Sequence, residues 1–184
     1  MSEVVSQFVL LCEDQMHERM VRAYMRICGY ESLERRIVRL VASEMTSGGN
    51  SGWVLDEFPK QLNACRKRQA KTLLIVLLDV DTFTVEDRRR QLNERLKASE
   101  FEPLRSDDPL SLLLPKRHVE TWIRSLNGEE VSEEDDCKAH RAPDKKVVRD
   151  AARILYEWSR TTAVVGDTCV PSLRESLAEW RKIG

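Results

Sequence analysis

The most apolar stretch of the chain is Leu73-Leu74-Ile75-Val76-Leu77-Leu78, and it leads directly into Asp79-Val80-Asp81. Six aliphatic residues bounded by polar ones are too short for a typical helix, and they suit a parallel strand that is covered on both faces. On an extended backbone, the two aspartates would face the same side, roughly 6 to 7 Å apart, with Val80 turned into the core. We therefore predict a central parallel strand that delivers two carboxylates to one edge of a sheet.

A second apolar run, near the N-terminus, repeats this arrangement. Phe8-Val9-Leu10-Leu11-Cys12 is short and β-prone, and Glu13 follows it at once. Because the carboxyl ends of parallel strands meet at one edge of an open α/β sheet, we expect Glu13 to lie near Asp79 and Asp81. Aspartates are common in turns without any ligand, but a turn does not require the glutamate. The three carboxylates together predict a site for a hard divalent cation, Mg²⁺ or Mn²⁺.

Strands and helices are expected to alternate along the rest of the chain. We predict strands at 37–41 and 110–114, a helix directly after Glu13, a loop at 47–52, and a helix over 59–68 with Pro59 in its first turn. Capping boxes at 84–87 and 172–175 predict two further helix starts. Apolar spacing predicts helices at 119–126 and 147–158.

The bulk composition fits a globular protein, and nothing in the sequence supports a membrane role. The chain has 184 residues, of which 41% are hydrophobic and 33% charged, with a formal net charge of -1. Nucleic-acid affinity would therefore have to come from local basic runs, such as Arg88-Arg89-Arg90 and Lys116-Arg117-His118. The five cysteines form no Cys-x-x-Cys, and neither a signal peptide nor an apolar stretch of about 20 residues is visible. We expect a cytoplasmic protein.

Several further side chains are candidates for the site. Lys116 can stabilise developing phosphate charge, and Glu120 can complete a second metal position, although each also suits the start of an ordinary polar helix. His17 can approach the site or lie on a helix surface. Cys137 and His140 have a zinc-like spacing, but no matching second pair accompanies them. We expect Arg88, Arg117 and His118 to contact nucleic acid rather than metal.

The two acidic motifs resemble the topoisomerase–primase (Toprim) domain, in which a glutamate follows the first strand and Asp-x-Asp follows a later one. The resemblance rests on Phe8–Glu13 and Leu77–Asp81 and covers about residues 6–115. It departs from many Toprim domains in having Asp14, where they have glycine. The resemblance implies an α/β, Rossmann-like fold, with a mostly parallel sheet of about four strands flanked by helices. We expect a catalytic core at 1–127, with an acidic loop and a helical extension at 128–184 packed on it.

The resemblance also implies a function. Asp79 and Asp81 would be metal ligands, and Glu13 a ligand or general acid–base, in an Mg²⁺-dependent nuclease that cleaves DNA or RNA. Small Toprim proteins of the overcoming-lysogenization-defect type further imply an anti-phage role with an ATPase partner. Two alternatives remain open. One is a non-catalytic module that docks an ATPase, and the other is a haloacid-dehalogenase-like phosphatase, which also uses Asp-x-Asp but carries it on the first strand.

Overall fold

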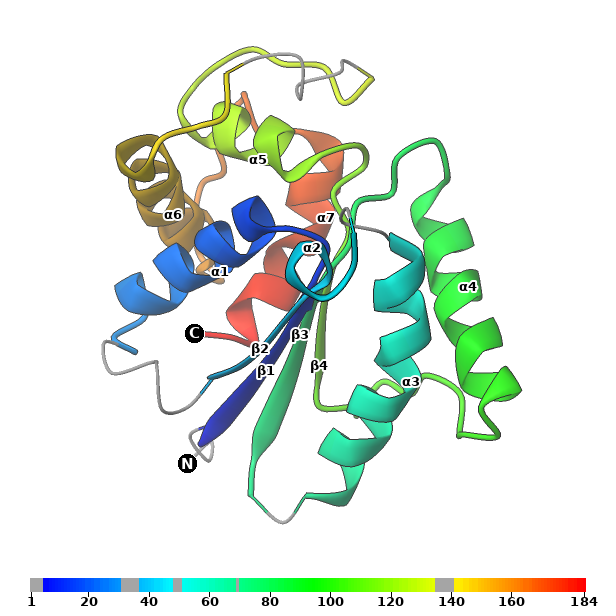
Figure 1. Cartoon of the computed structure of the whole chain (residues 1–184). Helices are drawn as coiled ribbons and strands as arrows, with labels where there is room; N and C mark the ends of the chain where they lie inside the picture. Colours follow the sequence, from blue (N-terminus) through cyan, green and yellow to red (C-terminus); the bar gives the residue numbers. More distant parts are fainter. Residues whose placement is uncertain (1–4, 31–36, 48–50, 69, 135–140) are drawn as a thin grey trace.

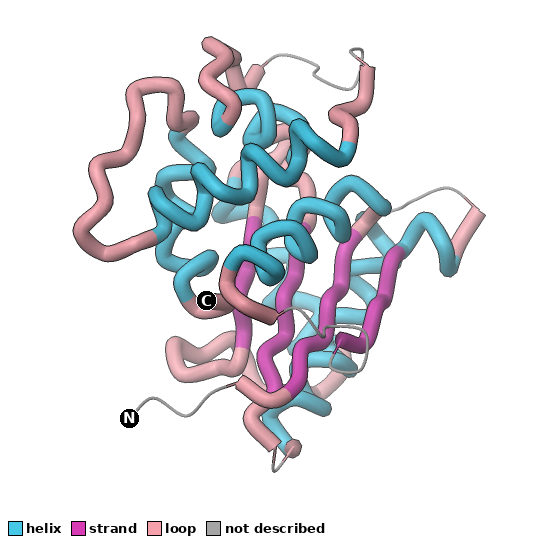
Figure 2. The backbone as a smooth tube through the Cα atoms, turned by 90° about the vertical axis from the view of Figure 1, so that its left-hand side faces the viewer, coloured by secondary structure: helices cyan, strands magenta, loops and turns pink. Residues whose placement is uncertain are grey.

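The computed structural model describes residues 5–30, 37–47, 51–68, 70–134 and 141–184. Its centre is a four-stranded, all-parallel sheet flanked by helices (Figures 1 and 2). This confirms the predicted α/β class with a parallel sheet. The elements, in chain order, are β1 Gln7–Cys12, α1 Gln15–Ile27, β2 Ile37–Val41, α2 Ala42–Met45, α3 Ser51–Lys67, β3 Thr72–Leu77, α4 Val85–Ala98, β4 Leu110–Leu113, α5 Val119–Leu126, α6 Lys145–Ser159 and α7 Pro171–Arg181.

The strand order is β2-β1-β3-β4, so the chain changes direction across the sheet between β1 and β3. The segment after β1 leads into α1 on one face, whereas the segment after β3 leads into α4 on the other face (Figure 1). The two connections diverge from the carboxyl ends of β1 and β3, and in open α/β sheets ligands usually bind at such a position. Glu13 and Asp79 lie at these two strand ends.

Alternate residues of the strands supply two separate cores. Phe8 and Leu10 face a core shared with α1, α5, α6 and α7, whereas Val9 and Leu11 face a core shared with α3 and α4. All six residues of β3 are buried, because this strand lies between β1 and β4 and its side chains enter the cores on both faces of the sheet. Helices α6 and α7 therefore contribute to the same core as β1, and they cover one face of the sheet together with α1 (Figure 1).

Two local predictions were wrong. Helix α3 begins at Ser51, well before the predicted start, so Pro59 lies in its interior and residues 51–52 are helical rather than part of a loop. An internal proline removes one backbone hydrogen bond, but burial of Val54, Phe58 and Leu62 on the sheet outweighs this local cost. Helix α7 begins at Pro171 without the predicted Ser172 capping box. The Ser172 hydroxyl instead accepts a hydrogen bond from the Trp122 indole N–H at 2.7 Å.

Helix α7 closes the outer edge of β4. The carboxylate of Glu179 accepts a hydrogen bond from the backbone N–H of Leu112 at 3.0 Å, and the Lys182 ammonium donates one to the Leu110 carbonyl at 3.1 Å. The same ammonium lies 2.8 Å from the Glu179 carboxylate, so the two side chains form one unit along the strand. These backbone N–H and C=O groups of β4, which could otherwise pair with another strand, are hydrogen-bonded within the chain.

Replacing Glu179 with alanine is expected to lower the free energy of unfolding by about 1–3 kcal/mol, because the edge N–H of Leu112 then loses its acceptor. Urea denaturation measures this loss, and hydrogen exchange should show faster exchange at the Leu112 amide. The exposed Glu175 on the same helix provides the matched control, since Glu175→Ala leaves the edge closed. Equal stability of the two variants would contradict the proposed edge-closing role.

Within the described parts of the chain, every helix is too short or too polar to cross a lipid bilayer.

Candidate metal centre

The backbone after β3 stays extended for three residues and then turns sharply at Asp81. Leu78 and Val80 continue the pairing with the β4 side by donating to the carbonyls of Leu113 and Pro115 at 3.1 and 2.8 Å. Asp81 has a φ of 56°, in the left-handed region that aspartate tolerates better than most residues. The Phe83 N–H closes the turn on the Val80 carbonyl at 3.1 Å. Val80 is buried as predicted, but the turn replaces the extended Asp-x-Asp geometry.

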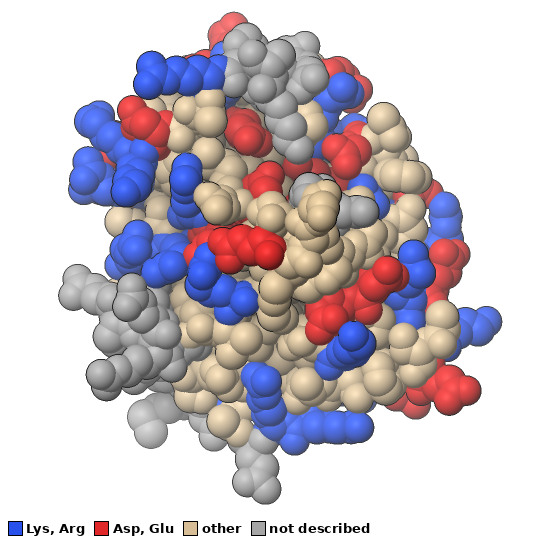
Figure 3. All heavy atoms as spheres, in the orientation of Figure 1, with Lys and Arg blue, Asp and Glu red and all other residues tan. Residues whose placement is uncertain are grey.

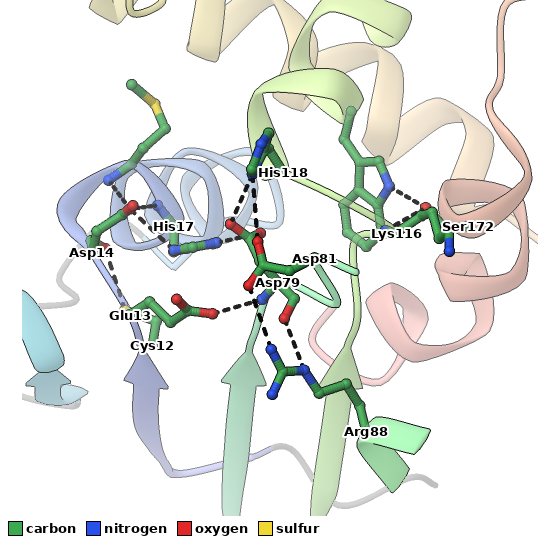
Figure 4. Close-up of polar contacts among 12 residues, drawn as sticks. Cys12, Glu13, Asp14, His17, Asp79, Asp81, Arg88, Lys116, His118 and Ser172 are labelled. Carbon is green, nitrogen blue, oxygen red and sulfur yellow. Dashed lines mark hydrogen bonds and ion pairs between the residues drawn. The ribbon is translucent and has the colours of Figure 1, made fainter. Parts of the chain in front are cut away.

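Asp79, Asp81 and His118 converge at this edge of the sheet (Figure 4). The Nδ1 atom of His118 lies 3.6 Å from Asp79 Oδ2 and 4.0 Å from Asp81 Oδ1. One ligand atom from each of the three residues lies within 4.8 Å of the other two. Donors around an ion at about 2.1 Å are separated by roughly 3 Å when adjacent and roughly 4 Å when opposite. The three residues could therefore hold one divalent ion.

His118 reaches the aspartates because of its position at the start of α5. It is the N-cap residue, with an extended backbone, but its side chain makes no capping hydrogen bond. Only 7% of the residue is exposed, and the imidazole faces Asp79 and Asp81 instead (Figure 4). His118 is thus placed where it could bind a metal ion, whereas its expected contact with nucleic acid stays a prediction. Its position after β4, on the same edge as Asp79, was the available signal.

His17 forms a buried bridge between two carboxylates. Its Nε2 lies 2.9 Å from Asp79 Oδ1, its Nδ1 lies 3.0 Å from Asp14 Oδ1, and its side chain has no exposed surface. Burial alone would lower the pKa of His17, but the charges of Asp79 and Asp14 and its contacts with both raise it well above its usual value. In turn, although burial opposes it, contact with His17 lowers the pKa of Asp14 to about 2. The helix-surface interpretation of His17 was wrong.

Glu13 contacts the backbone of Asp79 and is not one of the three converging side chains. Its Oε1 accepts a hydrogen bond from the backbone N–H of Asp79 at 2.8 Å. Burial, followed by the charge of Asp79, raises the pKa of Glu13 to about 7, although His17 and the bond from Asp79 act in the opposite direction. Sequence reasoning placed Glu13 beside the aspartates, and the structure does so too, but among the described residues the potential ligand cluster contains His118 in place of Glu13.

Arg88 does not have the predicted exposed position. Only 2% of it is exposed, and its guanidinium donates to the Asp79 carbonyl at 3.1 Å and approaches Asp81 Oδ2 at 3.4 Å (Figure 4). The guanidinium also lies 4.7 Å from the centre of the Phe83 ring. It holds the turn that carries Asp81, and the expected contact of Arg88 with nucleic acid stays a prediction. Lys116 binds the same turn, because its ammonium donates to the Phe83 carbonyl at 3.2 Å.

Arg117 and Glu120 lie close to His118 in the sequence, and both are half-buried. One carboxylate oxygen of Glu120 is buried without a hydrogen-bond partner in the described part of the chain. Burial raises the pKa of Glu120, and the negative charge of Asp79 adds to this effect. The Glu120 carboxyl is therefore close enough to Asp79 to interact with it electrostatically. The Nε atom of Arg117 is also buried without a hydrogen-bond partner among the described residues. Within the same residues, no ion pair joins Arg117 to Asp79 or Asp81.

Cys137 and His140, which have the zinc-like spacing, lie outside the described residues, as does the 48–50 part of the predicted loop.

Comparisons of the chain with protein-family models, with curated proteins and with solved structures found no match.

Proposed function

We propose that this protein is a metal-dependent nuclease, in which Asp79, Asp81 and His118 hold a divalent ion against a phosphodiester. The observation that carries this proposal is the convergence of the three side chains where the chain changes direction across the sheet. When bound, such an ion activates water and neutralises charge on the phosphate. Mg²⁺ prefers an oxygen-only shell and imidazole suits transition metals, so Mn²⁺ is expected to bind more tightly than Mg²⁺.

Two neighbouring carboxyl groups are suited to proton transfer. A general acid–base works best with a pKa near the operating pH, and that of Glu13 is raised to about 7. Its Oε1 is fixed by the Asp79 N–H, so the group is oriented before substrate arrives. Glu120 is a second candidate because burial raises its pKa and leaves one of its oxygens without a partner in the described residues. We assign proton transfer to Glu13, with Glu120 as the second candidate, and stabilisation of the charge on the reacting phosphate to Lys116.

Positive charge suited to a nucleic-acid backbone gathers over α1 and α6. Figure 3 shows Lys and Arg side chains on this side of the molecule, where α6 lies in Figure 1. Asp150 neutralises part of this charge through its contacts with Lys146, Arg149 and Arg153. Non-specific binding to nucleic acid depends on such local patches rather than on net charge. The exposed basic residues of the patch are Arg19, Arg26, Lys145, Lys146, Arg149 and Arg153.

The phosphatase alternative is disfavoured by the burial of Asp79. In that chemistry, the first aspartate attacks phosphorus directly, whereas Asp79 has no exposed surface and its Oδ1 is bound to His17. We also propose membership of the Toprim family, an anti-phage role and an ATPase partner. These three proposals rest only on the resemblance of the two acidic motifs. Copurification with an ATPase from the native host tests the partner separately from the chemistry.

The wild-type protein tests the reaction. We expect cleavage of DNA or RNA in Mn²⁺, slower cleavage in Mg²⁺ at equal concentration, and none in excess EDTA. Electrophoresis of a labelled substrate measures the cleavage, and titration calorimetry measures binding of Mn²⁺ in the absence of substrate. Cleavage that persists in EDTA would contradict the proposal. Tight Mn²⁺ binding without cleavage of any nucleic acid would favour the non-catalytic interaction module.

A further inference from the structure

A pocket of about 500 Å³ opens between α3 and α4 next to the metal centre. Arg88 lines it while contacting the Asp79 carbonyl and the Asp81 carboxylate, so the pocket and the centre share a wall. Phe83, another lining residue, follows Asp81 by only two positions. Two residues span at most about 7 Å, which places this aromatic side chain within a nucleotide's reach of the proposed ion.

Phe83 is unusually exposed for an aromatic residue of this chain. Its exposed fraction is 41%, and the other large hydrophobic residues exposed in the described regions are the aliphatic Val38, Met45 and Val164. The Arg88 guanidinium lies 4.7 Å from the ring centre, so the ring is held in place. Lys116 fixes the backbone beneath it by donating to the Phe83 carbonyl. A fixed, exposed ring beside a phosphate-binding centre is suited to stacking on a base.

The remaining lining has the mixed character of a base-binding pocket. Leu55 gives an apolar wall, Gln91 and Arg95 give polar groups, and Glu94 adds one carboxylate. The Gln91 side-chain oxygen accepts a hydrogen bond from Arg88 at 2.9 Å, which orients the amide and presents its N–H₂ group as a donor for a base carbonyl. Pockets for small ligands usually measure about 300–1,000 Å³ and combine apolar walls with a few fixed polar groups.

We infer that this α3–α4 pocket binds one unpaired nucleobase of the substrate strand, next to the phosphate at the metal centre. The inference rests on the proposed nuclease function and adds to it the substrate class, a strand that is single-stranded at the cleavage position. A base paired within a duplex cannot stack on Phe83, because its faces are already covered by its neighbours. The protein therefore selects single strands or frayed ends over closed duplex.

Binding in EDTA, without cleavage, tests the inference. A fluorescein-labelled oligothymidylate of twelve nucleotides and a closed hairpin duplex serve as probes, with anisotropy as the readout. Phe83→Ala is expected to weaken oligothymidylate binding about tenfold, the usual effect of losing one stacked base. Hairpin binding should stay unchanged, and Phe83→Trp should restore oligothymidylate binding. Val164→Ala, at an exposed apolar position between α6 and α7, is the matched control.

Unchanged oligothymidylate affinity in Phe83→Ala, or an equal loss for the hairpin, would overturn the inference. Circular dichroism of each variant shows whether the fold is retained, and if Phe83→Ala does not fold, Phe83→Leu, which keeps an apolar side chain without an aromatic face, should show the same selective loss. Failure here is distinguishable from failure of the proposed function. Mn²⁺-dependent cleavage with no role for Phe83 refutes only the base pocket, whereas Phe83-dependent binding without any cleavage refutes only the nuclease.

Discussion

Asp81→Asn is expected to abolish metal-dependent cleavage while leaving the fold intact. Asp81 is the most accessible member of the proposed metal centre, with 40% of its side chain exposed. Asparagine has the same shape and tolerates the left-handed backbone at this position, where φ is 56°. The substitution removes one negative charge and one of the two carboxylates proposed as metal ligands. Substitutions outside the ligand shell of metal sites typically cost 10–100-fold, so loss of a direct ligand should cost at least about 100-fold in cleavage rate.

Two measurements separate this result from general damage to the protein. Titration calorimetry should show Mn²⁺ affinity falling together with the cleavage rate, and the thermal unfolding midpoint without metal should stay close to that of the wild type. Asp107→Asn removes an equal charge from a side chain that is 78% exposed and outside the centre, and it should change neither property. Full activity in Asp81→Asn would show that the centre does not bind the catalytic ion.

The parallel sheet was predictable because its signals are local. A buried parallel strand has apolar side chains on both faces, so β1 and β3 appear in the sequence as unbroken apolar runs. The capping box at Thr84 was predictable for the same reason, since both of its hydrogen bonds join residues three positions apart. The edge that gathers Glu13 and Asp79 follows from the parallel direction of the strands. What the sequence pattern did not reveal was the left-handed backbone at Asp81, which ends the extended geometry expected for Asp-x-Asp.

The errors arose where contacts outside the local sequence pattern decide the outcome. Arg88 stands in a basic run that suggests solvent, but the carbonyl of Asp79 and the carboxylate of Asp81 draw it into the protein. Ser172 has the spacing of a capping residue, yet Trp122 and Glu133 bind its hydroxyl from fifty and thirty-nine positions away. Pro59 is tolerated inside α3 because the helix is held by the sheet beneath it. None of these contacts has a signature in the adjacent sequence.

His17 is the residue that sequence reasoning undervalued most, and its removal should have opposite effects on folding and on metal binding. The imidazole lies between Asp14 and Asp79 with no exposed surface, and in its charged form it balances the buried Asp79 carboxylate. Removing one member of a buried charge pair typically destabilises a protein by about 3–5 kcal/mol. We expect a loss of this size in the free energy of unfolding of His17→Ala without metal, measured by urea denaturation.

The same substitution should increase the affinity for Mn²⁺, because it removes a positive charge that competes with the ion for Asp79. Saturating Mn²⁺ is therefore expected to recover part of the stability that His17→Ala loses, since a ligand that binds only the folded state stabilises it. Lys60→Ala is the control. It breaks an exposed ion pair with Glu57, where the ammonium side chain is 72% exposed, and should cost at most about 1 kcal/mol with no effect on Mn²⁺. If His17→Ala instead lost both stability and Mn²⁺ affinity, the imidazole would help to bind the ion. That result would contradict the proposal that charged His17 competes with the ion for Asp79.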